Sequence, residues 1–193
     1  MHAGTPSQTI GPFFHFALDQ PEWSDLTTSA PTGERIVIEG QVLDGERAPV
    51  DDALLEIWQA NAEGKYDQPE DAQADERVEP RFRGFGRVLT DAQGRYQFTT
   101  LRPGRVKGRD GALLAPHINV AIFARGLLKQ LVTRIYFAGE QANETDPLLT
   151  AIADPTARRT LLAVRHDASA GRPAMYRFDI VLQGAGETVF FDI

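Results

Sequence analysis

The sequence predicts an all-β protein with a sandwich or barrel architecture. Short runs rich in Val, Ile, Phe and Tyr recur along the chain, and clusters of Gly, Pro, Asn and Asp separate them. Many short strands with turns between them are typical of sandwiches and barrels. A chain of 193 residues is long enough for one substantial core, whereas a second core would be cramped. We therefore expect one domain over residues 31–193, preceded by an arm over residues 1–30.

The expected strands share a β-branched and aromatic composition, and each ends near a turn signal. In chain order they are residues 35–43, 54–58, 86–90, 95–99, 117–123, 131–137, 176–182 and 188–191. The segment Asp91–Gly94 separates the third strand from the fourth, and its Asp and Gly favour a tight turn. We therefore expect these two strands to pair as a hairpin.

The remaining segments predict one short helix, long surface loops and an extended arm. Asp154 suits an N-cap, Pro155 suits the first turn, and the run through Leu162 continues the helix. The stretch Asp67–Arg83 carries much charge and almost no apolar residue, which predicts a long surface loop. The segment Thr5–His15 is rich in Pro and Gly and predicts an extended arm. Such an arm either straps its own domain or reaches into a partner.

Composition excludes several classes of function. The formal net charge is −7 without a basic block, which argues against nucleic acid or anionic lipid as a partner. The chain has no cysteine, so disulfides and thiolate metal sites are excluded. No apolar run approaches the roughly 20 residues that span a bilayer, and the first residues lack the features of a signal peptide. We expect a cytoplasmic protein that binds neither nucleic acid nor membranes.

The histidines give no complete metal site. His117 and Asn119 lie two residues apart in an expected strand, so their side chains point to the same face. A His-x-His pair would offer two imidazoles to one metal ion, but an Asn amide is a poor ligand for a transition metal. A lone histidine in a strand is also often a core residue hydrogen-bonded to a neighbour. The chain has no Gly-x-Ser-x-Gly motif, and the residues alone assemble no self-contained catalytic site.

Several segments, taken in order, resemble one known family. They are Thr5–Pro12, Leu55–Tyr66, Gly84–Asp91, Pro116–Asn119 and Tyr176–Asp192, and they span nearly the whole chain. Together they resemble the intradiol ring-cleavage dioxygenases, and within that family the alpha chains of two-chain members. The resemblance implies a β-sandwich and an alpha/beta hetero-oligomer whose beta chain holds a non-haem ferric iron, Fe(III). It also implies cleavage of protocatechuate with O2 between the two hydroxyl-bearing carbons, giving 3-carboxy-cis,cis-muconate in the beta-ketoadipate pathway of aromatic catabolism.

The resemblance implies iron ligation by two tyrosines and two histidines, of which this chain keeps two positions. Tyr66 stands at the first tyrosine position and His117 at the first histidine position. Asn119 replaces the second histidine, and Val106 lies in the loop where the second tyrosine belongs. Losing half of the ligands should abolish tight binding, so we expect no metal ligand and no catalytic residue in this chain. Without metal, Tyr66 and His117 should pair with each other or with buried water.

The resemblance further implies that the alpha chain supplies one wall of the active site. Arg134 is a charge inside an apolar strand, and its guanidinium is suited to a substrate carboxylate or to an acidic side chain of the partner. An ordinary solvated strand arginine is the alternative. Thr9, Gly11 and Pro12 match the arm segment that borders the pocket. Two other functions stay open: a self-sufficient intradiol catechol dioxygenase, and a non-enzymatic β-sandwich binding domain.

Overall fold

The computed structural model describes residues 7–9, 11, 13–14, 18, 20–28, 31–66, 82–108, 111–166 and 172–192. Strands dominate this part of the chain, which confirms the all-β class. They are β1 Arg35–Leu43, β2 Leu54–Gln59, β3 Phe85–Leu89, β4 Arg95–Leu101, β5 His117–Phe123, β6 Leu131–Phe137, β7 Leu162–His166, β8 Ala174–Arg177 and β9 Ile180–Val181.

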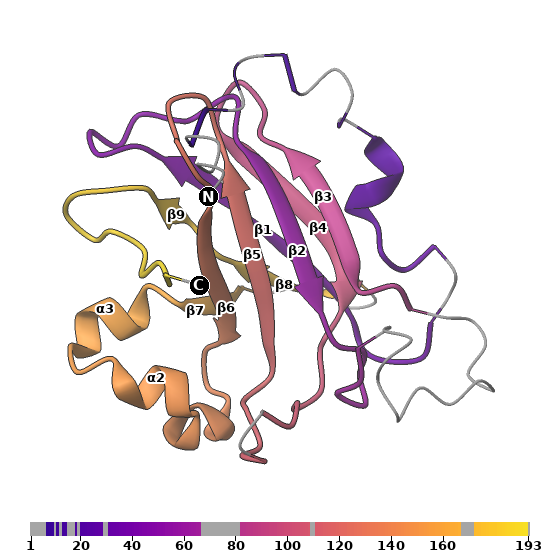
Figure 1. The fold of residues 1–193 in the computed structure, drawn as a ribbon. Helices are drawn as coiled ribbons and strands as arrows, with labels where there is room; N and C mark the ends of the chain where they lie inside the picture. The colour runs from indigo at the N-terminus through magenta and orange to yellow at the C-terminus, as the bar shows by residue number, and fades with distance from the viewer. Residues whose placement is uncertain are drawn as a thin grey trace, which may run out of the picture.

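The strands form one continuous hydrogen-bonded order, β3-β2-β5-β6-β7-β8-β1-β4, and β9 pairs with β1 outside this path. Most neighbours are antiparallel, whereas β6 with β7 and β1 with β8 or β9 run parallel. Strand β7 therefore joins a half made of β3, β2, β5 and β6 to a half made of β8, β1 and β4. Figure 1 shows these twisted halves with the helices beside the β6 and β7 end.

Both halves of the sheet contribute to one core. Side chains alternate along each strand, so that in β1 every second residue from Ile36 to Val42 is buried. These residues meet Phe98 of β4, Ile57 of β2 and Ile118 of β5 in a single apolar cluster. A smaller cluster around Tyr136, Leu149 and Leu161 lies next to the helices. The opposite faces of the strands are left to carry polar and exposed side chains.

The helical segments are more numerous than the sequence predicts. The expected helix exists as α3, Pro155–Arg159, and the Asp154 carboxylate accepts a hydrogen bond from the backbone amide of Thr156 at 2.8 Å. A second helix, α2, spans Pro147–Ala151, and two 3-10 turns lie at Pro21–Ser24 and Gln141–Thr145. The expectation of one helix is therefore wrong. The Asp-Pro pair that begins α3 recurs at Asp146 and begins α2 in the same way.

Several strands match their expected bounds, and the C-terminal ones do not. The strands expected over 35–43, 117–123 and 131–137 have those bounds. The strand expected over 176–182 is divided into β8 and β9. Between them, the Asp179 carboxylate accepts a hydrogen bond from the Gln41 backbone amide at 3.0 Å, in place of a bond between the two backbones. Residues 188–191 form no strand, although the backbone amide of Phe191 donates to Val132 at 2.8 Å. Strand β7 is not predicted from the sequence, since its burial does not alternate along the strand.

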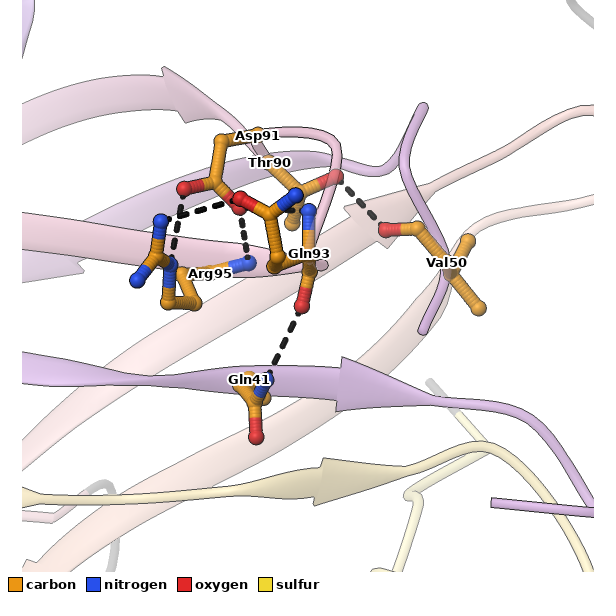
Figure 2. Close-up of polar contacts among 6 residues, drawn as sticks. All are labelled: Gln41, Val50, Thr90, Asp91, Gln93 and Arg95. Atoms are coloured by element: carbon orange, nitrogen blue, oxygen red, sulfur yellow. Dashed lines mark hydrogen bonds and ion pairs between the residues drawn. The ribbon is translucent and has the colours of Figure 1, made fainter. Parts of the chain in front are cut away.

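The turn expected at Asp91–Gly94 is confirmed. The Gly94 amide donates to the Asp91 carbonyl at 2.8 Å, and Gly94 has φ +69°, which glycine adopts without strain. The Asp91 carboxylate accepts from the backbone amides of Gln93 and Arg95, both at 2.9 Å, as Figure 2 shows. This is the local geometry that Asp and Gly favour.

The hairpin expected around that turn is wrong. Strand β3 pairs with β2, and β4 pairs with β1, at opposite ends of the strand order. The chain is redirected at Thr90, whose amide donates to the Ala53 carbonyl at 2.9 Å. The Thr90 hydroxyl donates to the Val50 carbonyl at 2.8 Å (Figure 2). These bonds tie the end of β3 to the loop before β2. The turn therefore connects the two halves of the sheet.

Some expectations fall outside the described residues. They include most of the loop expected over Asp67–Arg83, part of the arm, and Pro12. Within the described part of the chain, no helix has the length and apolar character needed to cross a bilayer.

Candidate functional site

One row of outward side chains crosses the face of β3, β2, β5 and β6. The register pairs Phe85 with Trp58, Trp58 with Asn119, and Asn119 with Arg134. Their neighbours along each strand point into the core, so these four side chains share the outer face. Phe85 is 44% exposed and Trp58 is 41% exposed. The row therefore places two aromatic rings, an amide and a guanidinium side by side.

Asn119 is the centre of the polar contacts in this row. The Arg134 Nε donates to the Asn119 Oδ1 at 2.9 Å. The Asn119 Nδ2 donates to the Trp58 carbonyl at 3.2 Å and to the Tyr66 hydroxyl at 3.4 Å. The Tyr66 ring also meets the Trp58 ring edge-on, with centroids 5.3 Å apart. Asn119 thus bridges the Arg134 guanidinium and the Tyr66 hydroxyl and fixes the orientation of both.

The phenol of Tyr66 has a raised pKa. Burial is the main cause, because desolvation disfavours the phenolate. The hydrogen bond from Asn119 and the positive charge of Arg134 act in the opposite direction without overcoming burial. At neutral pH Tyr66 is therefore a neutral phenol.

His117 lies two residues before Asn119 and is buried, with 2% exposure. Its Nδ1 lies 2.8 Å from the Ala115 carbonyl, which can only accept, so Nδ1 carries the proton of the neutral ring. Burial lowers the pKa of His117 to about 4, and the charge of Arg134 contributes in the same direction. The His117 ring packs 5.8 Å from that of Tyr136. The imidazole is thus a neutral, hydrogen-bonded part of the structure.

A buried carboxylate supports this part of the site. Asp146 accepts hydrogen bonds from the backbone amides of Ala115, Leu148 and Leu149 at 2.9, 3.0 and 3.2 Å, respectively. The Tyr136 hydroxyl donates to the same carboxylate at 3.2 Å. Burial raises the pKa of Tyr136 well above its usual range, while a hydrogen bond from Arg134 opposes the shift. The single carboxylate of Asp146 therefore caps α2 and also binds the segment just before β5.

These residues do not fit a ferric ion. Within the described residues, no group of three or more His, Asp, Glu or Cys side chains gathers around a common point. Both polar atoms of Asn119 are engaged by neighbours, and one neighbour is the cation Arg134. Val106 offers an aliphatic side chain, and its carbonyl accepts from the Leu114 amide at 2.8 Å. A ferric ion is stabilised by anionic donors, and this set supplies at most one phenolate.

In place of the expected pairing with each other, Tyr66 and His117 have separate hydrogen-bond partners. Tyr66 meets Asn119, and His117 meets the Ala115 carbonyl. Both groups still have a polar partner, as buried polar groups require. The partners come from the neighbouring backbone and from the residue that replaces the second histidine.

Thr9 of the arm lies away from this row. The Thr9 hydroxyl accepts a hydrogen bond from the Gly126 amide at 3.0 Å, beyond the end of β5. Asn119 lies near the start of β5, and the four residues to Phe123 already span about 13 Å. Gly11 has φ +71°, and among the described residues no atom beyond its chain neighbours lies within 4 Å of the place that a Cβ would take. The structure thus does not bring Thr9 and Arg134 together within this chain, and Pro12 lies outside the described residues.

Sequence reasoning missed Trp58, Phe85, Tyr136 and Asp146. The first two could have been found from alternation, because the adjacent strand positions, Ile57 and Gly86, are buried. Asp146 carries the same Asp-Pro signal as Asp154. Tyr136 had no such signal, because its role depends on the pairing of β5 with β6.

Comparison with known proteins identifies the family. The sequence matches the family described as Dioxygenase over residues 10–184. It is 45% identical to the protocatechuate 3,4-dioxygenase alpha chain of Pseudomonas putida, over 97% of this chain and 96% of that protein. The chain belongs to the intradiol ring-cleavage dioxygenase family. The resemblance drawn from the sequence is therefore confirmed.

Other members of the family show how widely the match extends. The protocatechuate 3,4-dioxygenase beta chain of Burkholderia cepacia is 36% identical, over 94% of this chain and 77% of that protein. The structure of the dioxygenase domain of a carbohydrate-binding fusion protein from Streptomyces sp. SirexAA-E superposes with a TM-score of 0.63. That domain is 31% identical, and the match covers 95% of this chain and all of that domain. An alpha chain and a beta chain of one kind of enzyme are thus both relatives of this chain.

Proposed function

We propose that this chain is the alpha chain of a protocatechuate 3,4-dioxygenase, acting in an alpha/beta hetero-oligomer with an iron-bearing beta chain. The observation that carries the proposal is the identity to an alpha chain over almost the full length of both proteins. The match to a beta chain is weaker and covers less of that protein. The assembled enzyme cleaves protocatechuate with O2 between the two hydroxyl-bearing carbons.

The iron belongs to the beta chain in this proposal, where it binds the catecholate of the substrate. The support lies in the donor set of this chain, in which Asn119 replaces the second histidine and Val106 lies in the loop where the second tyrosine belongs. A chain without an iron centre contributes by assembling with the beta chain and by binding and orienting the substrate. We therefore assign no catalytic residue to it.

Arg134 is the residue that we propose to meet the substrate carboxylate. Its Nε edge is held by Asn119, so the guanidinium has a defined orientation on the outer face of β6. A planar guanidinium binds a carboxylate more specifically than an ammonium does, because two parallel hydrogen bonds fit its geometry. An acidic side chain of the beta chain would use the same chemistry.

The arm segment Thr9, Gly11 and Pro12 is proposed to border the pocket of the assembled enzyme. Gly11 supports this role because its open surroundings and φ of +71° allow close approach of another backbone. The proposal needs the pocket to lie at the boundary with the beta chain, since Thr9 and Arg134 are apart in this chain. Residues 1–30 then act as an arm, and residues 31–193 as the domain that it serves.

The same proposal covers the architecture and the compartment. We interpret the two halves of the sheet as the layers of a β-sandwich joined through β7, supported by the single core to which both contribute. We place the protein in the cytoplasm, as expected from its composition.

Co-expression with a beta chain tests the proposal. We expect the two chains to co-purify at equal amounts, and protocatechuate cleavage to require both. The beta chain should carry the visible ferric–tyrosinate colour. A coloured, iron-loaded and active homo-oligomer of this chain alone would overturn the proposal in favour of a self-sufficient enzyme. Failure to bind any beta chain, with no iron and no activity, would favour the non-enzymatic alternative.

A further inference from the structure

A cation already lies among the residues that stand at metal-ligand positions. Asn119 replaces a histidine, and its Oδ1 accepts from the Arg134 Nε at 2.9 Å. Its Nδ2 reaches the hydroxyl of Tyr66, which stands at a tyrosine position, at 3.4 Å. Arg134 sits directly across from Asn119 in the ladder between β5 and β6. Both the strand register and a hydrogen bond therefore position the guanidinium next to Asn119 and Tyr66.

The charge of Arg134 acts on three titratable rings of this site. It opposes the burial that raises the pKa of Tyr66 and of Tyr136, and it adds to the burial that lowers the pKa of His117. A positive charge that stabilises a phenolate and destabilises an imidazolium influences these rings as a bound metal ion would. The sign of the effect is the same at all three rings.

We propose that the Arg134 guanidinium takes the place of a metal ion in this chain, held by Asn119 at a former histidine position, and that its charge excludes cations from the site. Two explanations of metal exclusion then differ in what they predict. If missing donors were sufficient, restoring a histidine at position 119 would increase affinity whatever stands at 134. If the guanidinium excludes the metal, restoring the donor has little effect until the positive charge is removed.

The alternative, an arginine solvated on the surface of a strand, predicts different contacts. Such a side chain extends into water, as that of Arg165 on β7 does with its exposed position. Arg134 is half-buried, and its Nε is committed to a side chain of the adjacent strand. Asn119 in turn is fixed by the Trp58 carbonyl at 3.2 Å. This chain of contacts holds the guanidinium in place.

The test compares three versions of the full chain that all carry Asn119→His. The first keeps Arg134, the second adds Arg134→Lys, and the third adds Arg134→Met. Cobalt(II) is the probe, because its visible absorption reports ligation by histidine and tyrosine without any need for activity. We expect the methionine version to bind cobalt(II) at least tenfold more tightly than the other two. The lysine version controls for the loss of the guanidinium shape, since it keeps the charge.

Three results would overturn the proposal. One is equal affinity in the arginine and methionine versions, and another is equal affinity in the lysine and methionine versions. The third is absence of binding in all versions, because missing donors alone would then explain the exclusion. Arg134→Gln is a second neutral variant in case the methionine version is unstable, and thermal unfolding verifies that each version is folded. The measurement needs no beta chain, so its result is independent of the proposed function.

Discussion

Arg134 is the residue through which this chain is proposed to act on the substrate. In the assembled enzyme, Arg134→Ala should raise the KM for protocatechuate, with a loss in kcat/KM equivalent to about 2–3 kcal/mol if the charge pair is partly desolvated. Catechol lacks the carboxylate and should be affected much less. The ratio of kcat/KM for the two substrates is the quantity to measure.

A matched control distinguishes substrate recognition from a general effect of removing an arginine. Arg165→Ala removes an exposed arginine from β7 and should leave the ratio unchanged. An equal loss for both substrates in Arg134→Ala, with the assembly intact by size-exclusion chromatography, would assign Arg134 to the architecture of the site. Dissociation of the complex would assign it to an ion pair at the interface.

His117 should make the protein less stable in mild acid. Its pKa is about 4 in the folded chain, compared with an ordinary value of 6.5, because burial disfavours the imidazolium. Between these values the unfolded state binds more protons, so the free energy of unfolding falls as pH decreases from 6.5 to 4 and levels off below. The full loss is about 3 kcal/mol. Urea unfolding at several pH values measures it.

The His117→Gln variant should remove this component of the pH dependence. His166 lies half-exposed beside Glu39, and His166→Gln provides the comparison. If the two variants show the same slope of unfolding free energy against pH, the buried imidazole is not its source.

At the level of elements, the two Asp-Pro helix starts should differ in their contribution to stability. Asp146 is buried and accepts from three backbone amides and from Tyr136, so Asp146→Ala leaves several donors without a partner. We expect a loss of about 3 kcal/mol, more than a cap alone gives. Asp154→Ala removes one bond at an exposed cap and should cost about 1 kcal/mol. Equal losses in urea unfolding would contradict the anchoring role of Asp146.

The elements also show what the sequence can and cannot predict. The turn at Asp91–Gly94 is encoded by its own residues, and it forms as expected. Which strands pair on either side of it is decided by contacts far along the chain, such as that between Thr90 and Val50. A local signal therefore predicts the turn and misassigns the pairing. Strand β7 is hidden for another reason: its burial does not alternate, because Ala163 is buried whereas Val164 and Arg165 are both exposed.

In the candidate site, too, local patterns are predictable from the sequence and long-range contacts are not. The period of two along a strand places His117 and Asn119 on one face, and the structure confirms that relation. The contact of Asn119 with Arg134 depends on the register between β5 and β6, which no local pattern specifies. The resemblance to a family gave Arg134 a role, whereas its partner in this chain came only from the structure.

At the level of the whole molecule, the exposed row on the outer face suggests how the chain behaves alone. Phe85 and Trp58 are adjacent across β3 and β2, and both are more than one-third exposed. Exposed apolar surface of this kind marks sites of association, and obligate interfaces bury about 2,000 Å2 or more. We expect the isolated chain to self-associate, and the complex with a beta chain to stay discrete in analytical ultracentrifugation.

Variants of the isolated chain determine whether this row drives the self-association. Phe85→Gln removes a ring from the row and should increase the monomer fraction at a given concentration, because it halves the apolar pair that Phe85 forms with Trp58. Leu128→Gln is the control: Leu128 is 63% exposed but lies beyond β5, away from the row. If exposure alone mattered, the leucine variant would have the larger effect. A wild-type chain that is monomeric at high concentration would contradict both the self-association and an obligate partner.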